Sequence, residues 1–224
     1  MTNWNAFFPP VFVTIKVSLV AGFIVFALAL LTAHRMARSR MRVRSVIDTI
    51  LLLPLVLPPT VVGFLLLVLF GRQGRIGQTF EMLFDRTIVF TWGAAVIAAV
   101  VVAFPLAYRT MRAGFEGVEK ELEDAARAQG ASGWQVFRYI TMPLAGRSLT
   151  AGFLLGYARG LGEFGATLMI AGNIPGRTQT LPTAIYTAVD AGRMPLAWAW
   201  TGVIVLLSFA MLLAAERFNG GSRH

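Results

Sequence analysis

The sequence predicts an all-α integral membrane protein, with about five transmembrane helices in a single domain over residues 1–224. Three observations predict this class. Hydrophobic residues make up 56% of the chain and charged residues only 14%, where a soluble domain carries roughly 25%. The mean hydropathy is +0.67. The apolar residues also gather in blocks of about 20, the length of helix that crosses a hydrocarbon core of roughly 30 Å.

Five segments are apolar and long enough to span, and they define a core of about residues 11–215. They are residues 11–33, 46–70, 88–108, 148–172 and 196–215. The second contains Pro54, Pro58 and Pro59, which predict a kink or break that a packed bundle tolerates. After the fourth, Leu181-Pro182 predicts a short helix through Val189 that cannot reach across a membrane.

The basic residues predict the orientation. The segment after the first span carries five arginines, the segment 109–147 carries six Lys or Arg, and the tail adds Arg217 and Arg223, so thirteen lie on one side. The opposite loops hold five. Because Lys and Arg concentrate in cytoplasmic loops, we expect a multi-pass protein of the plasma (inner) membrane with its N-terminus outside and its C-terminus in the cytoplasm. The same rule explains the net charge of +9 without nucleic acid.

The composition excludes several kinds of chemistry. The chain has no cysteine, so disulfides, thiolate metal sites and cysteine nucleophiles are ruled out. Two histidines, His34 and His224, are too few for a metal cluster. We therefore expect no catalytic residue, no metal site and no cofactor bound by this chain. A membrane-embedded enzyme would need a metal cluster or a nucleophile with a base, and the sequence lacks these parts.

A soluble-looking helix pair is predicted within the cytoplasmic segment 111–147. Residues 116–129 have helix-forming composition, with acids early and Arg127 late. Gly130 follows, where a left-handed cap would end the helix. Ser132 and Gln135 then form a capping-box pattern that opens a second helix.

The second helix carries Trp134, Phe137, Tyr139 and Ile140, and we expect Pro143 to limit it, because the residue before proline avoids the helical region. Two interpretations of the pair are open on physical grounds. Its aromatic side chains either dip into the lipid headgroups or form a docking surface for a partner.

The spacing in this segment resembles the EAA loop of ABC importer permeases. That loop reads Glu-Ala-Ala, three residues, Gly, nine residues and Ile-x-Leu-Pro; this chain has Asp124-Ala125-Ala126, then Gly130, then Ile140-x-Met142-Pro143. Asp replaces Glu at 124 and Met replaces Leu at 142, which keeps charge or bulk. The resemblance implies a coupling helix that docks into a groove on a separate ATPase subunit, where ATP-Mg is used.

The fourth predicted span is unusual in its glycines and charges. Its glycines are Gly152, Gly156, Gly160, Gly162 and Gly165. The first three repeat every four residues, which gives a flat helix face suited to close contact. Arg159, Glu163 and Thr167 are also four apart and are expected to share a face. This face either holds an internal Arg159–Glu163 pair or borders a translocation pathway. We expect Arg159 and Glu163 to pair with each other or with near neighbours, the glycines then to line a dimer axis, and Thr167 to be available to hydrogen-bond the passing solute.

Residues 162–186 are similar to molybdate importer permeases, and sulfate permeases share only parts of this run. The resemblance implies the type I ABC importer permease fold and a homodimer of permeases. It also implies two cytoplasmic ABC ATPase subunits and an extracytoplasmic molybdate-binding protein. Asn173, Arg177 and Arg193 either face that protein or are ordinary solvated residues. A permease for tungstate or sulfate is the alternative, and a self-contained channel or carrier would not need the cytoplasmic helix pair.

Overall fold

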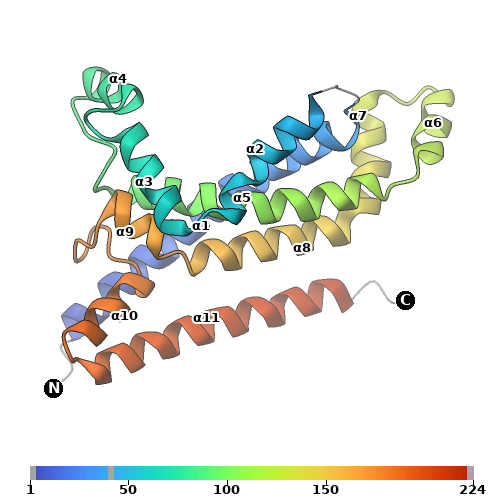
Figure 1. The fold of residues 1–224 in the computed structure, drawn as a ribbon. Helices are drawn as coiled ribbons and strands as arrows, with labels where there is room; N and C mark the ends of the chain where they lie inside the picture. Colours follow the sequence, from blue (N-terminus) through green and yellow to red (C-terminus); the bar gives the residue numbers. More distant parts are fainter. Residues whose placement is uncertain (1–3, 40–42, 221–224) are drawn as a thin grey trace.

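Helices build the whole of the described chain. This computed structural model describes residues 4–39 and 43–220, and every regular element among them is helical. The predicted all-α class is therefore confirmed. Three long helices form the centre: α1 (Trp4–Ala37), α5 (Trp92–Glu116) and α8 (Met142–Leu161). Figure 1 shows them along one long axis, with α8 antiparallel to the other two. Of the basic residues that predict the orientation, Arg40, Arg42 and Arg223 lie outside the described residues, as does His224.

The central helices pack through very small side chains. The glycines that α8 turns toward α5 are Gly152, Gly156 and Gly160. A Cβ on the first would lie 2.7 Å from Met111 Cγ, and one on the second would lie 2.9 Å from Ala107 Cβ. The expected close contact is confirmed. The same contact corrects the idea that this face lines a dimer axis, because buried alanines at matching spacing on α5, Ala99 and Ala103 among them, already cover it.

The predicted spans correspond to helices that differ in length and continuity. By length and apolar composition, α1, α5 and α11 (Met194–Gly220) can each cross a membrane. Helices α2 (Arg44–Val56) and α3 (Pro59–Phe70) qualify together, as a pair bent by 113°. The break at Leu57 and Pro58 confirms the kink expected from the prolines.

The fourth predicted span is divided in two. Helix α8 ends at Leu161, and α9 (Gly165–Ala171) begins after a break of three residues. Helix α9 packs tightly on α3: a Cβ on Gly63 would lie 2.7 Å from Ala166 Cα. The expectation of one continuous helix over 148–172 is therefore wrong.

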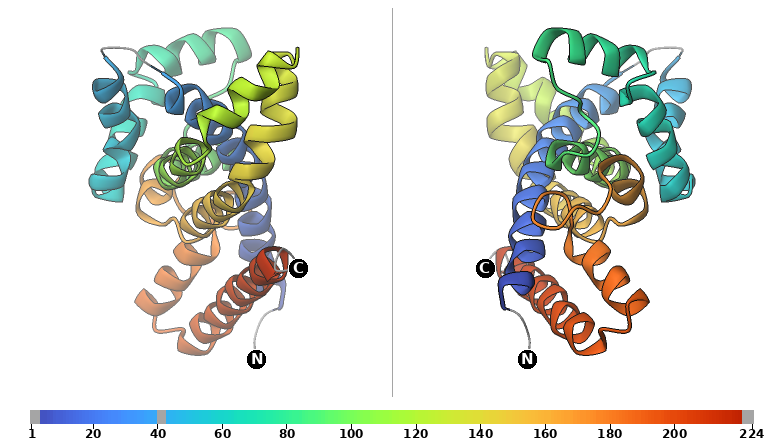
Figure 2. Two further views of the ribbon diagram at one scale, coloured as in Figure 1. Left: turned by 90° about the vertical axis from the view of Figure 1, so that its right-hand side faces the viewer. Right: turned by 90° about the vertical axis from the view of Figure 1, so that its left-hand side faces the viewer.

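The end of the molecule where α1 begins also holds α4 (Arg75–Phe84) and α10 (Leu181–Asp190). Helix α10 confirms the short helix expected from Leu181-Pro182. Its first N–H is accepted by Thr14 Oγ1 at 2.7 Å, which ties it to α1. Helix α4 has no counterpart among the sequence-based expectations. It stands away from the central helices in both views of Figure 2 and packs against α3.

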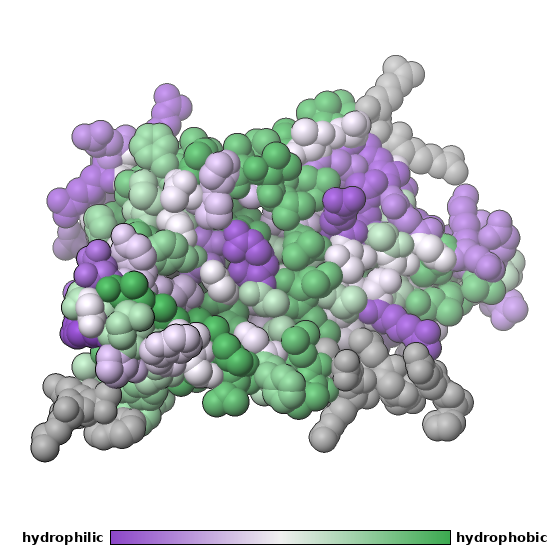
Figure 3. Space-filling view, turned by 60° about the horizontal axis from the view of Figure 1, so that its bottom comes forward, coloured by the Kyte–Doolittle hydropathy of each residue, from purple (hydrophilic) through white to green (hydrophobic). Residues whose placement is uncertain are grey.

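The opposite end holds the C-terminal part of α11 and three short elements (Figure 1). These are α6 (Lys120–Ala128), α7 (Gly133–Val136) and the π-helical turn η1 (Phe137–Thr141). On the face drawn in Figure 3, hydrophilic residues gather at both ends of the long axis, and a largely hydrophobic band with one smaller hydrophilic area lies between them. Helix α11 adds exposed apolar surface to this band, since only 11% of its span is buried.

Candidate coupling and translocation sites

The turn between α6 and α7 is fixed by local hydrogen bonds. Gly130 has φ +90°, the left-handed conformation that the sequence predicts there. Its N–H donates to Arg127 O at 2.9 Å, and the N–H of Ala131 donates to Ala126 O at 3.1 Å. This pair of hydrogen bonds is the Schellman motif. It turns the chain sharply, so α6 and α7 form one compact unit.

A capping box opens α7 as expected. The N–H of Ser132 donates to Gln135 Oε1 at 2.7 Å, and the N–H of Gln135 donates to Ser132 Oγ at 3.3 Å. The two bonds satisfy donors that would otherwise be free at the helix start.

Pro143 does not end this helix, which corrects the sequence-based expectation. The chain continues from α7 through η1 into α8 without leaving the helical region. In η1 the N–H of Met142 donates to Phe137 O, five residues back. This wider turn makes room for the proline ring, and Pro143 lies in the first turn of α8.

The aromatic residues of this unit face in two directions. Trp134 is 68% exposed and Tyr139 is 73% exposed. Phe137 is half-buried, with its ring centroid 4.5 Å from that of His34 on α1. Trp134 and Tyr139 are therefore available to a partner. Phe137 instead packs against α1 within the chain, so it is less available to a partner than the other two aromatic residues.

The remaining residues of the EAA-like pattern surround a shallow hollow. Ala126, Gly130, Tyr139 and Ile140 line this hollow, which has a volume of about 360 Å³. Asp124 and Ala125 lie on the exposed face of α6, and Asp124 pairs with Arg127 at 2.8 Å. Of the predicted loop residues, Ala126, Gly130 and Ile140 thus share this surface.

The buried acid of α6 is Glu123, which the sequence patterns did not single out. Its Oε1 lies 2.6 Å from Arg38 Nη2, just past the end of α1, and accepts from Thr141 Oγ1 of η1 at 2.7 Å. Arg127 approaches its other oxygen at 3.5 Å. Nothing in the local sequence separates Glu123 from neighbouring acids, because Arg38 lies 85 residues earlier.

A second ionic cluster ties α2 to α5 at the same end. Asp48 on α2 lies 2.6 Å from Arg112 Nη1 and accepts from the Tyr108 hydroxyl. Arg44 pairs with Glu116, which also accepts from Arg112 Nε at 2.9 Å. These pairs attach the start of the bent α2–α3 pair to the central helices.

The break between α8 and α9 holds the charged pair of the fourth predicted span. Arg159 Nη1 donates to Glu163 Oε2 at 2.7 Å, so the expected ion pair is present. The buried Glu163 also accepts from the N–H of Ala166 at 2.8 Å and thereby caps α9. Thr167 lies on α9 and is buried. The expectation that Arg159, Glu163 and Thr167 share one helix face is wrong, because α8 ends at Leu161 and Thr167 lies on α9.

Three of the other predicted pathway residues contribute packing. Gly156 and Gly160 lie against α5. Gly165 lies against α3, where an added Cβ would be 3.2 Å from Pro59 Cβ. Gly162 is exposed at the break between the two helices.

The three residues that could face an extracytoplasmic binding protein differ in exposure. Arg177 and Arg193 are exposed. Asn173 is half-buried, with its Oδ1 inside the protein. Only the two arginines are therefore fully open to a partner.

Comparison with known proteins gives consistent matches over nearly the whole chain. Residues 24–224 match the family described as "Binding-protein-dependent transport system inner membrane component". The protein YvgM of Bacillus subtilis (strain 168), named for molybdenum transport, is 52% identical over 95% of this chain and 94% of its own. The molybdenum transport system permease protein ModB of Escherichia coli (strain K12) is 45% identical over 84% of this chain and 80% of its own. A sulfate transport system permease protein, CysT of Salmonella typhimurium, is 34% identical over 92% of this chain and 76% of its own.

The fold has close counterparts among solved structures. The MetNI methionine ABC transporter, in inward-facing conformations, contains a chain that superposes with a TM-score of 0.78 at 18% sequence identity. The match covers 97% of each chain. At this identity the likeness concerns the fold, which is that of an ABC importer permease.

Proposed function

We propose that this chain, which belongs to the family of binding-protein-dependent transport system inner membrane components, is the permease subunit of an ATP-driven molybdate importer. The resemblance seen in the EAA-like loop is confirmed by that membership, and so is the type I ABC importer permease fold. The observation that carries the proposal is the α6–α7–η1 unit. It has the turn, cap and exposed aromatic side chains of a docking surface, at one end of a bundle of apolar helices.

Molybdate is the favoured substrate because the relatives named for molybdenum are the more similar ones. Identity is 52% and 45% to these two, against 34% to the sulfate permease. Tungstate and sulfate remain the alternative cargoes, since both are tetrahedral dianions like molybdate.

The partners follow from the same assignment. We infer that two copies of the chain form the pathway and that each receives a cytoplasmic ATPase subunit on the hollow around Gly130. ATP-Mg is then used by those subunits. An extracytoplasmic molybdate-binding protein delivers the anion at the end that holds α4 and α10. This arrangement requires the N-terminus outside and the C-terminus in the cytoplasm, as the basic residues also predict.

Uptake of radiolabelled molybdate tests the proposed function. Cells or proteoliposomes that hold the permease, its ATPase and its binding protein should accumulate molybdate when ATP is present. Excess unlabelled molybdate should abolish the signal, and excess sulfate should leave most of it. Accumulation that proceeds without the ATPase would instead identify a self-contained channel or carrier. If excess sulfate abolished the accumulation of radiolabelled molybdate and excess unlabelled molybdate did not, the chain would be identified as a sulfate permease.

A further inference from the structure

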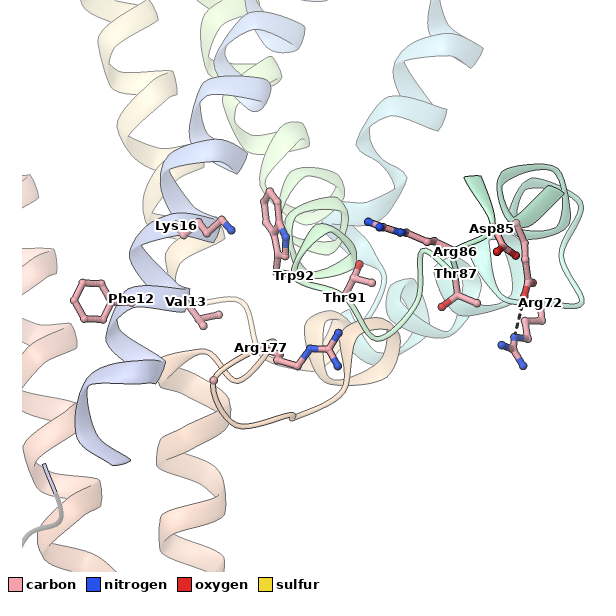
Figure 4. A pocket seen from close by; sticks show the side chains of 12 residues that line it. Phe12, Val13, Lys16, Arg72, Asp85, Arg86, Thr87, Thr91, Trp92 and Arg177 are labelled. Carbon is pink, nitrogen blue, oxygen red and sulfur yellow. Dashed lines mark ion pairs between the residues drawn. The ribbon is translucent and has the colours of Figure 1, made fainter. Parts of the chain in front are cut away.

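A cleft with a volume of about 950 Å³ opens at the end of the molecule opposite the coupling unit. Its basic side chains come from separate segments of the chain. Figure 4 shows Lys16 on α1 and Arg86 ahead of α5 directed toward Trp92, with Arg177 from the loop ahead of α10 below Thr91. The cleft shares no residue with the Arg159–Glu163 break or with the coupling unit.

The cations of this cleft are largely uncompensated. Within residues 4–39 and 43–220, no carboxylate lies within ion-pair distance of Lys16, Arg86 or Arg177. A fourth cation, Arg72, is paired with Glu81 at 3.5 Å. Asp85 is the remaining acid in the lining. Three free cations therefore face one free carboxylate, which leaves a net charge that matches a dianion.

Lys16 is held in place without being neutralised. Its Nζ lies 3.9 Å from the centroid of the Trp92 ring, a cation–π contact. Such a contact orients the ammonium and leaves its positive charge available. One feature of the sequence points to this residue: Lys16 is a lone cation inside the first apolar segment, and ionisable residues in such segments often belong to functional sites.

We propose that this cleft is a weak binding site for a tetrahedral oxyanion dianion, where molybdate rests between its release by the binding protein and its passage through the permease. This inference rests on the proposed function and on the orientation that comes with it. A cleft lined by charges of one sign concentrates counter-ions. The three cations are exposed, so the anion keeps part of its hydration shell. Weak binding suits transport, because an anion held too firmly would not leave.

The cations line a hollow, which favours a small anion over the surface of a protein. A carboxylate on a folded partner would have to project into the cleft to reach Lys16 beside Trp92. A free oxyanion reaches the same place by diffusion.

Direct binding of radiolabelled molybdate tests the proposal. The permease–ATPase complex would be placed in nanodiscs without its binding protein, and equilibrium dialysis at low salt would measure bound molybdate. The variants are Lys16→Gln, Arg86→Gln and Arg177→Gln. Arg193→Gln is the matched control, since Arg193 is exposed at the same end but does not line the cleft.

We expect saturable binding to the wild-type complex, weakened about 3-fold or more by each cleft variant and unchanged in the control. Wild-type binding no greater than that of empty nanodiscs would overturn the proposal. So would an equal loss in Arg193→Gln, because the effect would then come from general surface charge.

A parallel measurement separates the anion from an acidic protein surface. The affinity of the molybdate-loaded binding protein for the complexes should be the same in the wild type and in the Lys16→Gln and Arg86→Gln variants, whereas Arg177 is itself open to a partner. Weakened docking together with unchanged molybdate binding would assign the cleft to the partner and overturn the proposal. The outcome is also distinct from the uptake test: molybdate uptake without binding in the cleft would refute the site alone, and binding without uptake would refute the proposed function alone.

Discussion

Glu123 joins three elements through one carboxylate. It meets Arg38 beyond α1, Thr141 in η1 and Arg127 on its own helix. Any movement imposed on α6 by a partner would therefore reach α1 and the start of α8 through this side chain. A buried carboxylate with these partners is also expensive to disturb, since its removal leaves polar groups unpaired.

Glu123→Gln should destabilise the permease by about 2 kcal/mol. The amide keeps an acceptor for Thr141 but loses the charge that pairs with Arg38. The effect is smaller than for a fully buried pair, because the Arg38 side chain is 30% exposed. Thermal unfolding of the purified protein measures it. Asp124→Asn is the control, since that side chain is 55% exposed and should shift stability by no more than about 0.5 kcal/mol. Equal shifts in the two variants would contradict the assigned role.

The Arg159–Glu163 pair predicts a particular pattern of transport defects. Arg159→Gln or Glu163→Gln alone leaves one uncompensated charge at membrane depth, which is costly. The double variant Arg159→Gln with Glu163→Gln removes both charges and keeps an acceptor for the Ala166 N–H. Its molybdate uptake, normalised to the amount of permease in the membrane, should exceed that of either single variant. A double variant as poor as the two losses combined would show that the residues act independently.

At the scale of elements, the α6–α7 turn depends on a backbone conformation more than on side-chain contacts. Nothing lies within 4 Å of a Cβ added to Gly130, so a substitution there meets only the strain of φ +90°. Gly130→Val should cost roughly 1–2 kcal/mol in the turn and reduce co-purification of the ATPase subunit while membrane insertion stays normal. Gly133→Val is the control, because Gly133 is equally open but is helical. A Gly130→Val permease that retains its ATPase as well as the control does would refute the prediction.

The elements predicted correctly are those that local sequence determines. The Ser132–Gln135 capping box, the left-handed Gly130 and the break at Pro58 each depend on residues within a few positions of one another. Pro143 does not end the helix because the π-turn before it makes room for a proline ring, and the local sequence does not announce that turn.

The features that were missed depend on distant residues. Glu123 pairs with Arg38, which lies 85 positions earlier in the sequence. The glycine face of α8 packs on alanines of α5, such as Ala103 and Ala107, and only the fold connects these two distant segments of the sequence. The division of the fourth span at Gly162 likewise follows from the packing of α9 on α3.

At the scale of the whole molecule, the two ends differ in chemistry. The end with α6, α7 and η1 presents exposed aromatic side chains and ion pairs that tie helices together. The end with α4 and α10 presents the cleft with its free cations. An importer needs this difference, because a partner that supplies motion and a partner that supplies the anion must bind on opposite sides of the membrane.

The orientation of these ends can be tested with single cysteines, because the chain has none of its own. Thr79 lies on α4 and Gln129 lies at the turn after α6, and both are exposed. In intact cells, an impermeant thiol reagent should label Thr79→Cys and leave Gln129→Cys unlabelled, since the thirteen-to-five excess of basic residues predicts that the coupling end lies in the cytoplasm. After the cells are opened, both should react, which controls for accessibility. Labelling of Gln129→Cys alone in intact cells would show that the orientation is the reverse of the predicted one. The coupling surface would then lie outside, away from the ATPase, and the cleft would lie inside, where no oxyanion arrives from the medium.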